Sequence, residues 1–391
     1  MHYFEGLSFF MTLGFVLIVA FILNVFQKST YYLSLLFSLV MVYFVFIKTP
    51  DQLIALLGFV VLGYILVQLT AKLKDRKKTM PMMVLLAGLP LIVVKLLPVF
   101  KVNGFGFLGI SYMTFKLVQI IIEMYDGLIE KPMSVLDYTH FLLFFPALSS
   151  GPIDRSRRFM DDWHKQRSQA EYLELAGTGI FRLVLGLFYK LVVSGMVFQH
   201  MNGPMGKDVT YLIGYMYLYT AYLFFDFAGY SLMAVGASNI LGVETPMNFN
   251  FPFISIDIKD FWNRWHITLS TWLRDFVFSR VVMRFMRKKV FKKRLTTAMV
   301  AYMINMTFMG FWHGVTPEYI IYGMYHGVLM ASFEWYQKKS KFYKKNKNKT
   351  WYKITSWFIT MHLVMFGFLI FSGKPLLWIS KLILFGVSIS S

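Results

Sequence analysis

The sequence contains no cysteine among its 391 residues. Disulfides, thiolate metal sites, palmitoylation and a cysteine nucleophile are therefore excluded. The G-x-S-x-G, H-E-x-x-H and H-x4-D patterns of common hydrolases and acyltransferases are also missing. Acidic residues are scarce, with 20 against 40 basic ones. A catalytic site in this chain must therefore be built from residues outside these motifs.

Hydrophobic residues are abundant instead. They make up 57% of the chain and come in long runs, which is more than a soluble domain contains even when glycine is counted. Runs of this length indicate helices that cross a bilayer. We expect an all-α polytopic membrane protein with about 10–11 hydrophobic segments, in which residues 1–391 form a single membrane-embedded domain.

The hydrophobic runs predict where the spans lie. They are Leu7–Phe26, Tyr31–Ile47, Leu53–Ala71, Met82–Val99, Phe105–Tyr125, Leu175–Phe198, Tyr211–Phe225 with a further stretch to Leu241, Thr296–Phe311, Tyr319–Tyr336, Ile354–Phe371 and a short Pro375–Val387. Asp137–Ser150 ends in proline, serine and glycine, which predicts a re-entrant segment. Asn248–Val282 mixes charges with aromatics, which predicts short interfacial helices. Lys116 and Glu123 share one helix face and are expected to form an inward-facing pair.

The formal net charge of +20 allows two interpretations, nucleic-acid binding or basic cytoplasmic loops. Four basic clusters, at 72–78, 155–167, 284–294 and 338–349, all lie between apolar segments. The positive-inside rule explains this placement better than nucleic acid does. We therefore expect a multi-pass plasma-membrane protein with its N-terminus outside. The basic loops can attract anionic membrane lipids or dock an acidic soluble partner.

Two histidines in aromatic surroundings are the main candidates for chemistry. His313 lies between Trp312 and Gly314, and His266 follows Trp265. A neutral imidazole can accept a proton near physiological pH, and a histidine at membrane depth is a functional candidate.

Three further histidines lie in apolar runs, namely His140, His326 and His362. For these, a packed or hydrogen-bonded role is expected. No metal site is expected, because His313 and His326 are 13 residues apart, point to different helix faces and have a proline between them.

Six blocks of sequence resemble the membrane-bound O-acyltransferase family. They are Phe107–Tyr112, Phe145–Arg155, Asp226–Ser231, Phe261–Phe276, Gly310–Gly314 and Tyr322–Gly327, within a core of roughly 100–335. Asn263 departs from the family pattern, in which many members carry a basic residue. The resemblance implies a ring of helices around a central tunnel.

The resemblance also implies roles for individual residues. His313 matches the general base of the family, and His266 matches the second position, which orients or polarises a reactant. Further matches, expected along the substrate path or tunnel, are Trp312, Trp265, Arg264, Ser270, Asp226, Asp154 and Arg155. No tightly bound cofactor is implied, because the donor is a phosphopantetheine thioester on a carrier protein.

Within the family, two features favour the branch that D-alanylates teichoic acids. These are the Ser150–Arg155 block and Leu232, where alginate-acetylating relatives usually carry aspartate. That branch implies an acidic D-alanyl carrier protein on the cytoplasmic side. Outside, the acceptor is teichoic acid or an intermediate acceptor protein. Two alternatives stay open, an exopolysaccharide O-acetyltransferase and a transporter or flippase.

A docking site for the carrier is expected just before the third basic cluster. Its residues are Val281, Val282, Met283, Arg284 and Arg287. An apolar patch rimmed by cations suits an acidic partner. The other interpretation of this segment is a helix that rests in the lipid interface.

Overall fold

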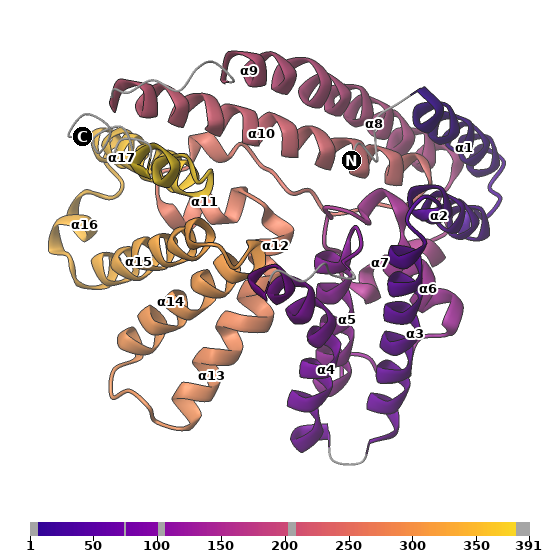
Figure 1. Cartoon of the computed structure of the whole chain (residues 1–391), viewed down its shortest axis with the longest axis horizontal. Helices are drawn as coiled ribbons and strands as arrows, with labels where there is room; N and C mark the ends of the chain where they lie inside the picture. Colours follow the sequence, from indigo (N-terminus) through magenta and orange to yellow (C-terminus); the bar gives the residue numbers. More distant parts are fainter. Residues whose placement is uncertain (1–6, 74–75, 101–105, 202–208, 381–391) are drawn as a thin grey trace, which may run out of the picture. The chain divides into compact units, whose positions relative to one another are not determined.

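The computed structural model describes residues 7–73, 76–100, 106–201 and 209–380. Within these ranges the regular secondary structure is helical and contains no strand, so the all-α prediction is confirmed (Figure 1). The chain divides into two compact units, residues 1–187 with 230–247 and residues 188–229 with 248–391. The boundaries at 187/188 and 229/230 fall inside helical stretches.

The first unit is built mainly from the N-terminal half. Its elements are α1 (Leu7–Val25), α2 (Tyr31–Phe46), α3 (Pro50–Lys72), α4 (Arg76–Leu96), a 3-10 turn (Leu97–Phe100), α5 (Ile110–Tyr125), α6 (Val135–Leu143), a 3-10 turn (Phe145–Ala147), α7 (Ser156–His164) and α8 (Gln169–Leu187). The last part of α10 (Val209–Ile240) completes it.

The second unit contains the two candidate histidines. Its elements are a π-helical turn (Phe188–Val193), α9 (Ser194–Met201), the first part of α10, a 3-10 turn (Pro252–Ile254), α11 (Ile258–Arg264), α12 (Ile267–Leu273), a π-helical turn (Arg274–Phe278), α13 (Ser279–Arg287), α14 (Arg294–His313), α15 (Pro317–Lys339), α16 (Lys341–Asn346) and α17 (Thr350–Phe371).

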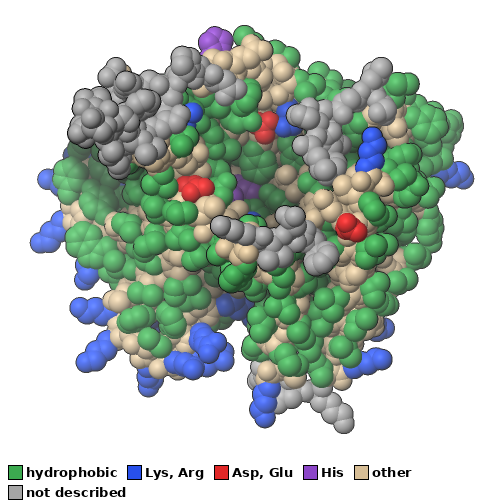
Figure 2. Space-filling model, viewed as in Figure 1, with side chains coloured by type: hydrophobic (Ala, Val, Ile, Leu, Met, Phe, Trp, Pro, Cys, Tyr) green, Lys and Arg blue, Asp and Glu red, His purple; other side chains and the backbone are tan. Residues whose placement is uncertain are grey.

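Within the described ranges, five helical stretches are long and apolar enough to cross a bilayer. They are Pro50–Lys72, Lys78–Phe100, Gln169–Met201, Val209–Ile240 and Thr350–Phe371, and the shorter Phe9–Val25 and Tyr31–Phe46 are also apolar. Hydrophobic side chains cover much of the face seen in Figure 2. Lipid is the solvent that such a surface requires, so the chain is a multi-pass membrane protein.

One expected segment differs from the structure. The run Tyr211–Phe225 and the stretch to Leu241 form one continuous helix, α10, because Gly229 alone does not break it. Most of the nine-residue α6 lies within Asp137–Ser150, and at about 13 Å this helix is too short to span, which agrees with the prediction that the segment is not a simple span. Thr296–Phe311 and Tyr319–Tyr336 do become helices, α14 and α15, although neither is among the five candidate spans. Part of Pro375–Val387 lies outside the described residues.

Lys116 and Glu123 point inward as expected, with 2% and 4% of each residue exposed. The expected pairing between them is wrong. The Lys116 ammonium donates to the Phe141 carbonyl at 2.9 Å, and Glu123 accepts from the Ser156 hydroxyl at 3.3 Å. Each charge has a partner from α6 or α7 because those segments pack on α5 at different heights.

Basic side chains gather at the ends of helices. In the second unit, Lys and Arg lie over the ends of α13, α14, α15 and α16 (Figure 2). The clusters at 284–294 and 338–349 occupy these ends. The cluster at 72–78 includes positions 74–75, which are outside the described residues.

Close backbone packing of α14 against α15 positions the end of α14. A Cβ on Gly310 would lie 2.4 Å from the Tyr319 carbonyl oxygen, and one on Gly323 would lie 2.6 Å from the Met306 carbonyl oxygen. Neither carbonyl can move away without disturbing its helix. The two glycines therefore let the helices approach more closely than any side chain would allow.

This contact yields a stability prediction. Gly323→Ala should lower stability by about 1–3 kcal/mol, because the added methyl overpacks the α14–α15 contact. Thermal unfolding of the detergent-solubilised protein measures the loss. Gly214→Ala on α10 is the matched control, since its Cβ would meet nothing within 4 Å. Equal melting temperatures for the two variants would contradict the proposed packing role.

Candidate functional site

A tightly fixed segment between α11 and α12 carries His266. The Asp257 carboxylate caps α11 by accepting from the backbone amides of Lys259 and Asp260, both at 2.9 Å. At the start of α12, the Ile267 amide donates to the Asn248 carbonyl at 2.9 Å. The Thr268 hydroxyl donates to the Asn248 side-chain oxygen at 2.6 Å. These bonds fix the backbone on both sides of His266.

His266 itself adopts the left-handed backbone conformation, with φ of +45°. This conformation is unusual for a residue with a side chain and is often found at functional sites. The residue is 5% exposed, and its ring lies edge-on to Phe227 with centroids 4.7 Å apart. The chain thus accepts a strained backbone to aim an imidazole into the protein interior.

His313 is the last residue of α14. Its half-buried ring lies among Trp312, Tyr319, Tyr322 and Phe371, with centroid distances of 4.6 to 6.2 Å. A Cβ on Gly314 would lie 2.3 Å from the Tyr319 ring. The glycine therefore allows Tyr319 to close against the helix end, and His313 keeps a fixed position in an aromatic wall.

The two histidines act on one another electrostatically. Burial lowers the pKa of His266, and the nearby His313 lowers it further. Neither α11 nor α12, which flank His266, is among the candidate spans. His266 is accordingly neutral at physiological pH and can serve as a hydrogen-bond donor or acceptor. The two candidates that the sequence singled out thus belong to one site in the second unit.

A cavity of about 190 Å³ lies beside this site in the second unit. Its lining comes from α11, α12 and the following π-helical turn, and from α14 and α15. The lining residues are Lys259, Trp262, Asn263, Ser270, Thr271, Leu273, Arg274, Phe278, Tyr302, Asn305, Met306, Met309 and Met330. Met309 precedes His313 by one helical turn, so the cavity and the imidazole share a face of α14.

Three residues predicted along the substrate path have structural contacts next to His266. Trp265 is buried and packs against Phe261 and Phe368. The Arg264 guanidinium pairs with Asp260 at 2.7 Å. The Ser270 hydroxyl donates to the Trp265 carbonyl at 3.1 Å and lines the cavity. Of these three, only Ser270 borders the cavity, while the other two support the α11–α12 segment.

Asp226 lies on α10 and accepts from the Lys190 ammonium at 2.5 Å. Lys190 belongs to the π-helical turn that follows α8. Turns of this kind frequently mark functional sites. The pair joins that turn to α10 inside the second unit, and the predicted tunnel role of Asp226 stays a prediction.

Asp154 and Arg155 lie in the first unit, before α7. The buried Asp154 carboxylate accepts from the Arg158 side chain at 2.7 Å and from the Arg155 backbone amide at 2.6 Å. The Arg155 guanidinium donates to the Gln119 side-chain oxygen at 3.2 Å. Burial raises the pKa of Asp154, and Arg158 acts in the opposite direction. This network ties α5 to α7.

The other membrane-depth histidines have the packed or hydrogen-bonded roles that were predicted. His140 shares a hydrogen bond with the Ser34 hydroxyl at 3.0 Å. His362 shares one with the Tyr217 hydroxyl at 2.9 Å. His326 is fully buried against Trp262 and Tyr322. Within the described part of the chain, no group of three or more His, Asp or Glu could hold a metal ion.

The residues predicted to dock a carrier lie on α13. Met283, Arg284 and Arg287 are exposed, while Val281 and Val282 are half-buried. Met286 is also exposed. The helix therefore presents apolar and cationic side chains together, as the sequence predicts.

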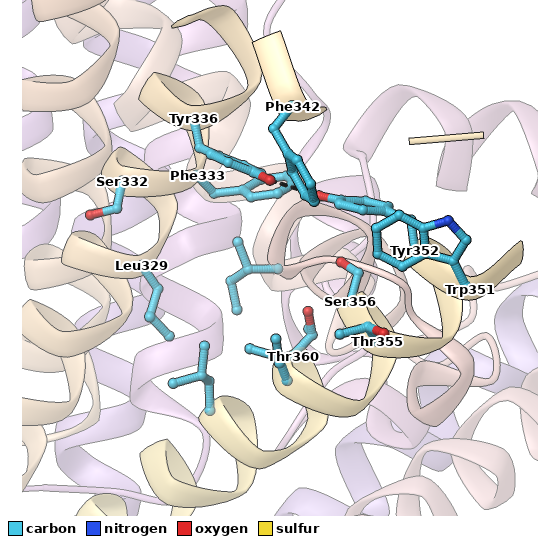
Figure 3. A pocket seen from close by; sticks show the side chains of 13 residues that line it. Leu329, Ser332, Phe333, Tyr336, Phe342, Trp351, Tyr352, Thr355, Ser356 and Thr360 are labelled. Carbon is cyan, nitrogen blue, oxygen red and sulfur yellow. Dashed lines mark hydrogen bonds between the residues drawn. The ribbon is translucent and has the colours of Figure 1, made fainter. Parts of the chain in front are cut away.

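A second, larger cavity of about 450 Å³ lies between α15, α16 and α17 (Figure 3). Phe333, Tyr336, Phe342 and Tyr352 form one end, and Leu329 and Thr360 lie deeper. Among the described residues, no His, Asp, Glu, Lys or Arg borders it. Because it has no imidazole, carboxylate or amine, the candidate site is the histidine pair.

Among the residues that line the smaller cavity, sequence reasoning predicted only Ser270 on the substrate path, and it missed Asn305 and Trp262. Asn305 is polar within the apolar α14, two turns before His313, and Trp262 precedes His266 by four residues. The spacing of Asn305 from His313 is a helical repeat and could have identified it. The position of Trp262 depends on how α11 packs, which the sequence alone does not reveal.

Comparison with known proteins identifies the family. The model of the membrane-bound O-acyltransferase family matches residues 9–372. The teichoic acid D-alanyltransferase of Bacillus subtilis is 40% identical over 390 residues, covering 95% of this chain and 98% of the relative.

The teichoic acid D-alanyltransferase of Streptococcus thermophilus is likewise 40% identical, covering 95% of both chains. A protein named as a probable alginate O-acetylase of Pseudomonas syringae is 31% identical, covering 69% of this chain and 49% of the relative. Since the family match spans nearly the whole sequence, this chain belongs to the membrane-bound O-acyltransferase family and is an acyl-transferring enzyme of the membrane.

Proposed function

We propose that this enzyme transfers D-alanine from a carrier-protein thioester to a hydroxyl acceptor for the D-alanylation of teichoic acid. The observation that carries the proposal is that His313 and His266 lie within electrostatic range of one another and next to residues that line one cavity. The two D-alanyltransferases that match along nearly their whole length support the choice of acyl group.

The proposed reaction has one covalent step. The His313 imidazole takes the proton from the acceptor hydroxyl as its oxygen attacks the thioester carbonyl. The carbon–sulfur bond breaks, the new ester bond forms, and the proton passes from His313 to the leaving thiolate. His266, held neutral and oriented by its buried segment, donates a hydrogen bond to a reacting oxygen.

The reactants arrive from opposite sides in this proposal. The donor is the phosphopantetheine arm of an acidic carrier protein, which comes from the cytoplasm through a tunnel bordered by the second unit. The acceptor, teichoic acid or an intermediate acceptor protein, comes from outside. The protein lies in the cell membrane, with its basic clusters on the cytoplasmic side and its N-terminus outside, in keeping with the positive-inside rule.

The predicted general base can be tested directly. His313→Ala should lower transfer by about 10²- to 10⁴-fold, because that is the range contributed by a positioned proton acceptor. Transfer is measured with purified protein, loaded carrier protein and mass spectrometry of the acylated product. His362→Ala is the control, because that imidazole only hydrogen-bonds Tyr217 and the Phe358 carbonyl. Wild-type transfer by the His313 variant would remove its role.

The acyl group can be tested by competition. The enzyme should transfer D-alanine from a D-alanyl carrier thioester and leave an acetyl thioester of the same carrier largely unused. The acetylating relative makes this comparison necessary, because the O-acetylase shares 31% identity with the chain. Preferential acetyl transfer would replace the proposal with exopolysaccharide O-acetylation. Substrate movement without thioester consumption would indicate a transporter.

The carrier surface on α13 gives a third test. Arg284→Glu combined with Arg287→Glu should raise the KM for an acidic carrier about tenfold or more, because like charges then meet. The value of kcat should change little, since neither residue borders the cavity at the histidines. Lys344→Glu with Lys345→Glu on α16 is a charge-matched control. If both double variants raise KM equally, net charge explains the effect and α13 is not the docking surface.

A further inference from the structure

Asn305 is a buried amide with an unused hydrogen-bond acceptor. It lies in the middle of α14 and is 7% exposed. Among the described residues, its side-chain oxygen has no hydrogen-bond partner, and its amide nitrogen donates to the Met306 sulfur at 3.7 Å. An unsatisfied acceptor inside a membrane protein is costly. Such a residue therefore calls for a partner that comes from outside the chain.

Trp262 is a buried donor in the same situation. It is 7% exposed, and its indole nitrogen has no partner. Its ring is held between Phe261, at a centroid distance of 5.7 Å, and His326, at 5.2 Å. Because ring packing already fixes the side chain, the indole N–H is a positioned donor.

Both residues border the same cavity of about 190 Å³. Asn305 carries an unpartnered acceptor and Trp262 an unpartnered donor, and both atoms are covered in the ligand-free chain. Three methionines form much of the remaining wall, and a ligand reaches the two atoms by displacing these flexible thioethers. A secondary amide carries one N–H and one carbonyl oxygen on an otherwise slender chain. It matches this pair of groups, and the flexible thioether side chains adapt to the methylene groups beside it.

The cavity lies at a suitable distance from the predicted base. Asn305, Met309 and His313 are spaced four residues apart and share one face of α14, so Asn305 is about 12 Å from His313 along the helix. A pantetheine arm holds two secondary amides behind its sulfur. This part of the arm equals about three extended residues, or roughly 10 Å. An arm whose thioester reaches His313 thus places an amide near Asn305.

We propose that Asn305 and Trp262 form a recognition site for an amide of the donor's pantetheine arm. The Asn305 oxygen accepts from the amide N–H, and the Trp262 indole donates to the amide carbonyl. These two residues position the thioester and select an amide-bearing arm over a plain thioester. The inference rests on the proposed function, since it requires a pantetheine-borne donor.

The test combines variants with donors that have or lack amides. The donors are the D-alanyl thioester of pantetheine and the D-alanyl thioester of a plain alkanethiol. Asn305→Leu and Trp262→Phe each keep much of the side-chain volume while removing the acceptor or the donor. Each should lower kcat/KM for the pantetheine donor by about 10- to 100-fold. Each should change kcat/KM for the alkyl donor by less than about threefold, because that donor cannot use the lost bond.

Trp357→Phe is the matched control, because that indole already donates to the Phe253 carbonyl at 2.7 Å and lies outside the cavity. It should affect both donors equally. Equal losses with both donors in the Asn305 and Trp262 variants would show a structural role and overturn the inference, as would no loss. Retained transfer from the alkyl donor reports that each variant folds.

The acyl group is varied separately. Repeating the series with acetyl thioesters distinguishes the two ideas. If the wild-type enzyme uses only acetyl donors but the variants still lose its preference for the pantetheine donor, D-alanyl transfer fails and the recognition site stands. If D-alanine is transferred and the variants keep the wild-type preference, the recognition site fails and the proposed function stands.

Discussion

The contact between α14 and α15 is the constraint on which the site depends. Gly310 and Gly323 bring the two backbones together where a methyl group would collide with a carbonyl oxygen. In lipid there is no hydrophobic force to join helices, so this close packing must hold them. It fixes the C-terminal end of α14, and with it His313. The aromatic wall around the imidazole follows, because Tyr319 and Tyr322 come from the facing helix.

His266 is positioned by different means. Its segment is too polar and too short for a span, and side-chain caps and bonds to Asn248 hold it instead. A positive φ at a histidine is unfavourable unless the surroundings enforce it. The site thus pairs one histidine at the end of a packed helix with another on a rigid turn. A neutral second imidazole near the first suits the proton transfer proposed for this site.

Buried polar residues near the site fall into two groups. Some bond to partners within the chain and support the fold, and others have no such partner and can bind a substrate. Arg264, Asp226 and Asp154 all have ionic partners from within the chain, so their first effect is to hold elements in place. Asn305 and Trp262 have no such partners and border a cavity. The larger cavity near α17 has no charged side chain and no histidine among its described lining residues. Volume by itself is therefore a poor guide to the reactive centre of this protein.

The sequence by itself determined the fold class and the position of most helices. It also identified His266 and His313 as the candidates for chemistry. Hydrophobic runs and helical periodicity are local properties, and the blocks around His266 and His313 can be read in order along the chain. The hydrogen-bond partners of buried charged residues were decided only by the tertiary structure. Lys116 and Glu123 were expected to pair because they share a helix face, yet each bonds to a residue from another element.

The same holds for the cavity, whose walls come from segments that are far apart in sequence. The spacing of Asn305 from His313 could have drawn attention to it. Whether its oxygen has a hydrogen-bond partner depends on which side chains pack around it. Which groups meet depends on how helices pack, and that packing is set by contacts between distant residues rather than by any stretch of sequence alone.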